Sequence, residues 1–261
     1  MTMTSATNGR LWGAAAADWA TIQEQTCRTV YESTFDRLGL GPGSSYLDAG
    51  CGSGLAAMLA AKRGASVSGL DASENLLGIV RLRVPGGLFV QGDLEELPFN
   101  DQAFDFVTGF NSFQYAASPT RALSEAKRVA KPGAIVVIMT WGKPEGMQAA
   151  SLVAALKPLL PPPPAGAPGP FALSDEAALR SFASAAGLEP FELVDVDSPW
   201  RYADLGTALR GLGSSGVAAR AAEHSGDEAV DLAHSSALEP FRQDDASYTI
   251  GASFRCLFTR A

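Results

Sequence analysis

A glycine-rich turn at residues 48–54 constrains the fold of this chain more than any other feature. It reads Asp-Ala-Gly-Cys-Gly-Ser-Gly and directly follows Tyr46 and Leu47. Glycine adopts backbone dihedral angles that other residues rarely adopt, and it lets a ligand lie against the main chain. A helix is expected from about Leu55, and its free N–H groups would face whatever occupies the turn. The pattern predicts a buried strand, a tight turn and a helix, with a ligand at the turn.

Two aspartates follow the turn at the ends of further predicted strands. Asp71 ends the run 66–71, and Asp93 follows the run 87–92. A dinucleotide-binding turn has the pattern G-x-G-x-x-G and an acidic residue about 20 positions later. Asp71 meets the second requirement, but Leu55 stands where the third glycine is needed. A carboxylate at a strand end can accept hydrogen bonds from both ribose hydroxyls, and several nucleoside cofactors share that demand.

Five segments, in order, resemble the motifs of class I S-adenosylmethionine (SAM) methyltransferases. They are the turn 48–54, the strand ending at Asp71, the segment 92–99 (G-D-L-E-E-L-P-F), the strand 104–110 with Asn111, and the helix, Lys-Pro-Gly turn and strand over 122–140. The resemblance covers about residues 44–141 and is to the small-molecule branch that includes the ubiquinone- and menaquinone-biosynthesis methyltransferases. It implies transfer of a methyl group from SAM to O, N or C of a small-molecule acceptor, with S-adenosylhomocysteine as the product.

The resemblance also implies roles for individual residues. Asp71 would bind the ribose, and Asp93 the adenine amino group, with the backbone N–H of Leu94 facing the ring. Asp48 would orient the glycine turn or contact the amino group of the methionine part of SAM. The other expected cofactor contacts are Gly50, Cys51, Gly52, Ala72, Asn111 and Trp19. Structural alternatives remain open: capping for the two strand-end aspartates, a turn amide for Asn111, and packing for Cys51.

Two tryptophans near the N-terminus suggest a cover for the cofactor. Trp12 and Trp19 are seven positions apart and would share one face of a helix. The resemblance places this helix over SAM, where an aromatic ring favours a sulfonium cation. Ordinary packing of the helix is the alternative. Side chains around Asn111 are expected to line the substrate side: Phe110, Phe113, Gln114 and Tyr115.

Catalysis of methyl transfer demands little from the protein. Proximity and alignment supply much of the rate of an in-line displacement, and a general base helps when the acceptor is a hydroxyl. His224 and His234 are the two histidines of the chain and the weak candidates for that base. Glu223, Tyr202 and Trp200 have no better support. No cluster of His, Cys, Asp or Glu has metal-ligand spacing, so no metal is expected.

Composition narrows the partners and the location. The net charge of −8 argues against nucleic acid or an anionic membrane as a partner. Cys27, Cys51 and Cys256 are scattered and odd in number, which indicates a reduced, cytoplasmic setting. The first ten residues lack an apolar core, so we expect no signal peptide, and no apolar run is long enough for a membrane helix. The oligomeric state is not specified by any feature of the sequence.

Alternating strands and helices predict an α/β, Rossmann-like fold with helices on both faces of the sheet. By the resemblance, the sheet is seven-stranded and mostly parallel, with order 3-2-1-4-5-7-6 and an antiparallel last strand. The predicted strands are 45–48, 66–71, 87–92, 104–110, 134–140, 191–196 and 253–259. The predicted helices are 55–63, 73–82, 119–130, 175–186, 204–212, 217–224 and 227–241. Residues 1–261 would form one domain, with an N-terminal helical cap at about 9–37, a proline-rich connector at 161–170 and a helical lid inserted at about 202–251.

Other functions are compatible with parts of this pattern. One alternative is an enzyme that keeps SAM on the same scaffold but catalyses a rearrangement or a cyclisation. A second is a SAM-binding protein without catalysis, which the intact motifs disfavour. An NAD-dependent dehydrogenase is disfavoured by Leu55 and by the segment around Asp93.

Overall fold

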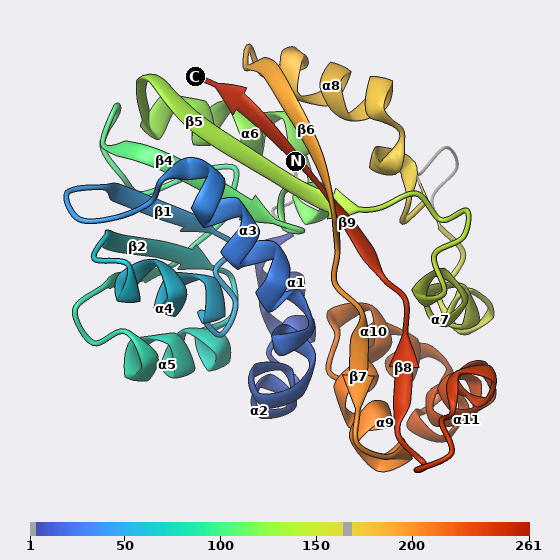
Figure 1. Ribbon diagram of the computed structural model, residues 1–261. Coiled ribbons are helices and arrows are strands. Elements are labelled where there is room, and N and C mark those ends of the chain that lie inside the picture. The colour runs from blue at the N-terminus through green and yellow to red at the C-terminus, as the bar shows by residue number, and fades with distance from the viewer. Residues whose placement is uncertain (1–3, 164–168) are drawn as a thin grey trace.

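A seven-stranded sheet forms the centre of the protein, with helices on both faces (Figure 1). The computed structural model describes residues 4–163 and 169–261, so the first three residues and residues 164–168 of the expected connector lie outside the described part. The strand order is β3-β2-β1-β4-β5-β9-β6. The strands are β1 (Ser45–Ala49), β2 (Ser66–Asp71), β3 (Leu88–Gln91), β4 (Phe104–Phe110), β5 (Ala130–Trp141), β6 (Glu189–Asp197) and β9 (Ser253–Arg260).

The strand directions confirm the predicted fold class. β1, β2, β3, β4 and β5 pair in parallel, whereas β9 runs antiparallel to both of its neighbours, β5 and β6. β9 occupies the place expected for the seventh strand because two short strands precede it in the chain. These are β7 (Trp200–Tyr202) and β8 (Tyr248–Ile250), which pair with each other outside the main sheet. These two strands were not predicted from the sequence because three residues are too few to show a period of two.

Side chains alternate between two cores, one on each face of the sheet. Tyr46 of β1 and Met139 of β5 point into the core beneath α3 (Arg28–Leu38), α4 (Leu55–Lys62) and α5 (Glu74–Arg83). Their neighbours Leu47 and Ile138 point into the core beneath α6 (Pro119–Val129) and α8 (Glu176–Ala185). Successive residues of a strand face opposite sides, so each strand contributes to both cores and is apolar over most of its length.

One strand begins earlier than the sequence predicted. β5 starts at Ala130, which pairs with Phe104, and the pairing then shifts before it resumes at Phe106 and Ile135. The Lys-Pro-Gly sequence that was expected to form a separate turn lies inside this irregular stretch, where Gly133 has a φ of +76°. Gly133 therefore has a dihedral angle typical of turns, but it lies in an irregular part of a longer strand and not in a separate turn.

The N-terminal cap is broken into short helices instead of the continuous helix expected to carry both tryptophans. α1 (Ser5–Trp12) ends at Gly13, and α2 (Ala16–Asp18), a π-helical turn (Trp19–Gln23) and a 3₁₀ turn (Glu24–Cys27) lead into α3. A Cβ at Gly13 would overlap the hydroxyl of Ser73. The helix therefore breaks at the point where the cap packs closely against the start of α5. The rings of Trp12 and Trp19 nevertheless meet edge to face, with centroids 5.0 Å apart.

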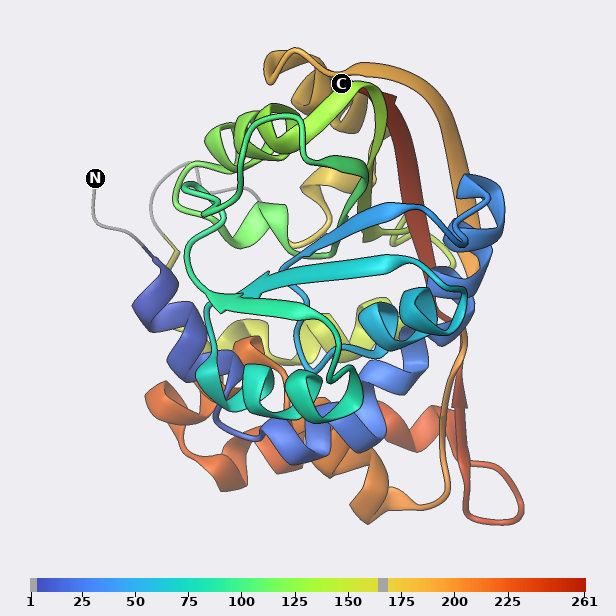
Figure 2. The ribbon, with the colours of Figure 1, turned by 90° about the vertical axis from the view of Figure 1, so that its left-hand side faces the viewer.

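A helical insertion between β7 and β8 lies beside the cap (Figures 1 and 2). It contains α9 (Leu205–Gly213), α10 (Gly216–Ser225) and α11 (Asp227–Leu238), and α7 (Ala149–Ala155) packs against α11. Asp204 and Ser215 cap the first two helices by accepting hydrogen bonds from backbone N–H groups. No helix in the described ranges has the length and apolar character needed to cross a bilayer.

Gly54 offers a test of how the glycine turn is packed. It has a φ of +86°, and a Cβ there would lie 2.6 Å from Cβ of Val80 on α5. We expect Gly54→Ala to lower the free energy of unfolding by about 3 kcal/mol or more, because steric overlap adds to left-handed strain. Gly133 is the matched control: its φ is +76° with no atom within 4 Å, so Gly133→Ala should cost only the strain, about 1–2 kcal/mol. Urea unfolding of both variants measures the difference, and equal losses would contradict the role of Val80.

Candidate functional site

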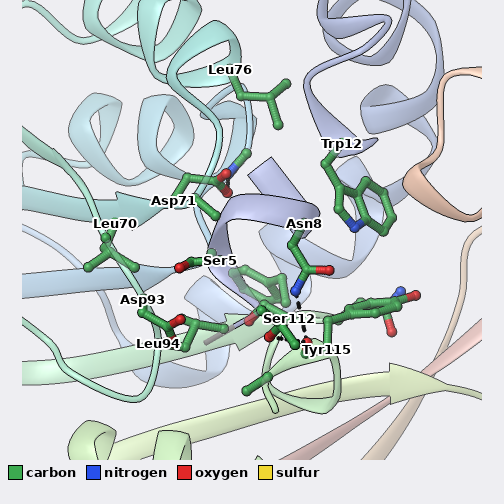
Figure 3. A pocket seen from close by; sticks show the side chains of 18 of the residues that line it. Ser5, Asn8, Trp12, Leu70, Asp71, Leu76, Asp93, Leu94, Ser112 and Tyr115 are labelled. Carbon is green, nitrogen blue, oxygen red and sulfur yellow. Dashed lines mark hydrogen bonds between the residues drawn. The ribbon is translucent and has the colours of Figure 1, made fainter. Parts of the chain in front are cut away.

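A cavity lies between the sheet and the N-terminal cap (Figure 3). One wall is built at the carboxyl ends of β1, β2, β3 and β4, where open α/β sheets bind their ligands. The other wall comes from α1 and the residues that follow it. Eight of the residues expected to contact a cofactor border this cavity: Trp19, Gly50, Gly52, Asp71, Ala72, Asp93, Leu94 and Asn111.

Asp71 joins the glycine turn to the start of α5. One carboxylate oxygen accepts a hydrogen bond from the N–H of Gly52 at 2.9 Å, and the other accepts from the N–H of Ser73 at 2.8 Å. Burial raises the pKa of Asp71, and these backbone hydrogen bonds act in the opposite direction. The carboxylate is thus held in a fixed orientation at the end of β2, and it borders the cavity.

Asp93 presents an unpaired acceptor at the end of β3. Its Oδ1 accepts a hydrogen bond from the N–H of Glu95 at 3.0 Å, whereas its Oδ2 is buried without a partner among the residues that the structure describes. Buried polar atoms are usually hydrogen-bonded because the loss of water is costly. This oxygen, beside the cavity, is therefore free to accept a further hydrogen bond.

Asp48 lies beneath the glycine turn and does not border the cavity. It is 1% exposed, and Oγ1 of Thr108, which shares a hydrogen bond with the hydroxyl of Tyr46, donates to it at 3.3 Å. Burial, with a smaller contribution from the nearby carboxylates of Glu24 and Asp71, raises the pKa of Asp48 to about 8. Asp48 can therefore affect a ligand only through the turn above it or after a rearrangement.

Cys51 also points away from the cavity. Its thiol is buried in the core beneath α4, and burial raises its pKa well above the usual range. A Cβ at Gly69 of the neighbouring strand would lie 3.0 Å from Sγ of Cys51. Cys51 thus contacts the sheet through its side chain, and only its backbone belongs to the turn.

Glu24, which was not predicted from the sequence, holds the glycine turn in place without bordering the cavity. It is 3% exposed and reaches from the cap to the start of α4, where its Oε1 accepts from the N–H of Leu55 at 3.2 Å. Its Oε2 accepts from Oγ of Ser53 and from Arg83, both at 2.6 Å. The preceding position, Gly54, has no side chain to cap α4, so Glu24 supplies the cap from a distant segment. Burial raises the pKa of Glu24, while Ser53 and Arg83 act to lower it.

α1 closes the other side of the cavity, as the labelled side chains in Figure 3 show. Nδ2 of Asn8 donates to the carbonyl of Tyr115 at 2.9 Å. Gly9 lies against the turn after β2, where a Cβ would be 2.8 Å from the carbonyl carbon of Ala72. Trp12 meets Tyr115 edge to face, with centroids 5.4 Å apart. Residues 4–12 thus supply a wall that the sequence analysis had expected mainly from the tryptophans.

The two histidines lie away from the cavity. His224 is exposed near the end of α10, and His234 is 2% exposed within α11. Burial lowers the pKa of His234 to about 4, so its imidazole is neutral near pH 7. Neither borders the cavity, which leaves both without access to a ligand in this conformation. Within residues 4–163 and 169–261, no group of three or more His, Cys, Asp or Glu side chains is arranged to hold a metal ion.

Comparison with known proteins agrees with this geometry. Residues 47–138 match the sequence model of a family described as "Methyltransferase domain". Residues 47–138 form a methyltransferase domain. The resemblance to SAM-dependent methyltransferases is thereby confirmed, and SAM is supported as the cofactor of this domain.

Curated relatives match only part of this chain. An uncharacterized methyltransferase of Synechocystis sp. is 35% identical over 116 residues, which cover 44% of this chain and 55% of that protein. A demethylmenaquinone methyltransferase of Renibacterium salmoninarum is 36% identical over 109 residues, which cover 42% and 46% respectively. The chain therefore spans about half the length of these relatives.

A solved structure extends the likeness of the fold beyond the methyltransferase domain. The crystal structure of the [4+2]-cyclase SpnF aligns over 92% of this chain and 82% of that one, with a TM-score of 0.59 and 21% sequence identity. At this identity the alignment shows a shared fold.

The pKa of Asp48 predicts how stability depends on pH. A pKa of about 8 in the folded protein, against 3.8 ordinarily, means that the folded state holds a proton that the unfolded state releases. This contribution is complete below pH 3.8 and is lost as the pH rises to about 8. We therefore expect the free energy of unfolding without ligand to fall between pH 6.5 and 8, by at most about 1.4 kcal/mol per pH unit.

Asp48→Asn should flatten this pH dependence, because an amide does not titrate. His234 does not contribute to the slope between pH 6.5 and 8, because its lowered pKa affects stability only below pH 6.5, the usual pKa of histidine. Chemical denaturation at several pH values measures the slope for both proteins. Identical slopes would show that Asp48 is already ionised in the folded protein.

Proposed function

We propose that this protein transfers a methyl group from SAM to O, N or C of a small-molecule acceptor. The observation that carries the proposal is the placement of Asp71 and Asp93 beside the glycine turn in one cavity. These residues lie far apart in the sequence, at the ends of neighbouring strands β2 and β3. The match of residues 47–138 to methyltransferase domains supports the same conclusion.

SAM would lie along the cavity from Asp93 to the glycine turn. The unpaired Oδ2 of Asp93 would accept a hydrogen bond from the adenine amino group. Asp71, at the end of the next strand, would accept from the ribose hydroxyls. Gly50 and Gly52 border the cavity with φ values of +83° and +54°, so that the methionine part can lie against their backbone.

Bound SAM supplies an activated methyl group on a positively charged sulfur. The chain would contribute mainly a fixed position for the two reactants, which is a large part of what such a displacement needs. Asn111, with its φ of +56° at the end of β4, borders the same cavity as Trp19 and is suited to orient polar groups near the reacting centre. The positive φ of an asparagine is uncommon and is often found at functional positions.

The acceptor would bind between α1 and the segment 111–116. The side chains there are neutral: Thr4, Ser5 and Asn8 provide hydrogen-bonding groups, and Trp12 and Tyr115 provide aromatic rings. A small molecule with an aromatic or apolar body suits this lining. The net charge of −8 disfavours nucleic acid as the acceptor, and three free cysteines favour action in the cytoplasm.

The second candidate function is a cyclisation or rearrangement on the same scaffold. The structure that aligns over 92% of this chain is described as that of a [4+2]-cyclase. A shared fold does not fix the reaction, because function depends on the site. SAM bound without loss of its methyl group would favour a cyclisation or rearrangement, and formation of S-adenosylhomocysteine together with a product 14 mass units heavier, about the mass of one added CH₂, would favour methyl transfer.

Substitution of the two aspartates tests the proposed cofactor site. We expect Asp71→Asn and Asp93→Asn each to weaken SAM and S-adenosylhomocysteine binding by about ten- to one-hundred-fold, because each replaces one acceptor oxygen with an NH₂ group that cannot accept a hydrogen bond. Asp105→Asn is the control: Asp105 lies at the opposite end of the sheet, at the start of β4, and pairs with Lys131 at 2.7 Å. Calorimetric titration measures the affinities, and circular dichroism checks that each variant is folded.

Two outcomes would contradict the proposal. Folded wild-type protein that binds neither SAM nor S-adenosylhomocysteine would exclude a SAM-dependent reaction. Aspartate variants that bind as tightly as Asp105→Asn would exclude this cavity as the cofactor site. Mass spectrometry of products from a panel of phenols, amines and stabilised carbanions would then identify the acceptor atom.

A further inference from the structure

The helical insertion between β7 and β8 contacts the cap and not the cavity. The described residues that border the cavity all come from residues 4–31 and 50–139. α10 packs against α1, and α9 packs against the π-helical turn of the cap. The insertion therefore supports the outer side of the cap, and its influence on a bound ligand must pass through cap residues.

Several contacts that the insertion and its adjoining strand β7 make with the cap are polar. The hydroxyl of Tyr202 donates to Oε1 of Gln23 at 2.8 Å in a buried position. Arg210 pairs with Asp18, and Arg10 pairs with Glu223. Both ion pairs are largely exposed, and exposed ion pairs contribute little to stability. They do not reach the wall of the cavity.

One apolar contact does reach that wall. Gly216, the first residue of α10, lies directly against the indole of Trp12, so that a Cβ at this position would be 2.6 Å from Nε1 and 2.7 Å from Cδ1. The φ of Gly216 is not in the left-handed region, so the backbone does not require glycine there. The absence of a side chain is what the packing of Trp12 requires.

Trp12 connects this contact to the ligand site. It borders the cavity and meets both Trp19 and Tyr115 edge to face, with centroids 5.0 Å and 5.4 Å away. Figure 3 shows the indole beside Asn8 on the cavity side of α1. Contacts with Gly216, Trp19 and Tyr115 leave the ring little room to move without displacing one of them.

We propose that Gly216 is a positioning residue for the cofactor cavity and acts through Trp12. By leaving room for the indole, it lets the insertion determine where this wall lies, so that displacement of the insertion changes cofactor affinity. The inference rests on the proposed function, because it takes SAM as the ligand of the cavity. The insertion would thus affect the affinity for the cofactor without contacting the cofactor itself.

Gly216→Ala tests the proposal, with Gly213→Ala as a matched control. Gly213 ends α9 in the same insertion, and a Cβ at this position would have no atom within 4 Å. Both substitutions favour helix formation, but only the first overlaps Trp12. We expect Gly216→Ala to weaken S-adenosylhomocysteine binding by about tenfold, as overpacking typically costs, and Gly213→Ala to leave it unchanged.

A Trp12→Ala background separates positioning from general damage. Removal of the indole makes room for the added methyl group, so Gly216→Ala should have no further effect on affinity there. In the ligand-free protein, Gly216→Ala should increase quenching of tryptophan fluorescence by acrylamide, and this change should be absent in the Trp12→Ala background. These readouts would not respond to a merely structural role of Gly216.

Several results would overturn the proposal. One is equal affinity in the two glycine variants, and another is an equal loss with and without Trp12. If Gly216→Ala fails to fold, the Trp12→Ala double variant must restore folding, and failure to do so would also overturn it. Wild-type protein that binds neither SAM nor S-adenosylhomocysteine would contradict the proposed function, and the ligand-free quenching would then decide whether Gly216 positions Trp12.

Discussion

The buried carboxylate of Glu24 is the interaction on which the geometry of the site depends. The glycines that let the turn approach a ligand leave α4 without a side-chain cap, and Glu24 provides one from the cap segment. The same carboxylate holds Ser53 and Arg83, and Arg83 also donates to the carbonyl of Ala20 at 2.8 Å. A buried charge is stable only when it is paired and hydrogen-bonded. One ion pair therefore fixes the turn, two helices and the cap relative to one another.

The features that the sequence predicted correctly depend on local patterns. The strands around the turn are short apolar runs that end in polar residues, and the carboxyl ends of parallel strands meet at one edge of a sheet. This is why Asp71 and Asp93 could be expected from the sequence to lie together. The antiparallel position of the last strand followed from the family resemblance, because no local pattern in residues 253–260 specifies its neighbours.

The features that were missed depend on contacts between distant segments. Glu24 lies 31 positions before Leu55, and no short motif links the two. The helix breaks after Trp12 where the cap packs on α5, and Gly216 contacts Trp12 where the cap packs on α10. In both places the lack of a side chain is required by a contact between distant segments, which no local pattern indicates. A heptad spacing of tryptophans predicted a single helix, but tertiary packing overrode that periodicity while still bringing the two rings together.

The position of β9 between β5 and β6 has a consequence for synthesis of the chain. A ribosome releases β1 to β6 first, yet β6 has no neighbour in the sheet until residues 253–260 emerge. Until then, β5 presents an unpaired and strongly apolar edge, which is the kind of surface that aggregates or recruits chaperones. The sheet consequently closes after most of the chain has been translated, and a chain truncated before β9 would expose this edge.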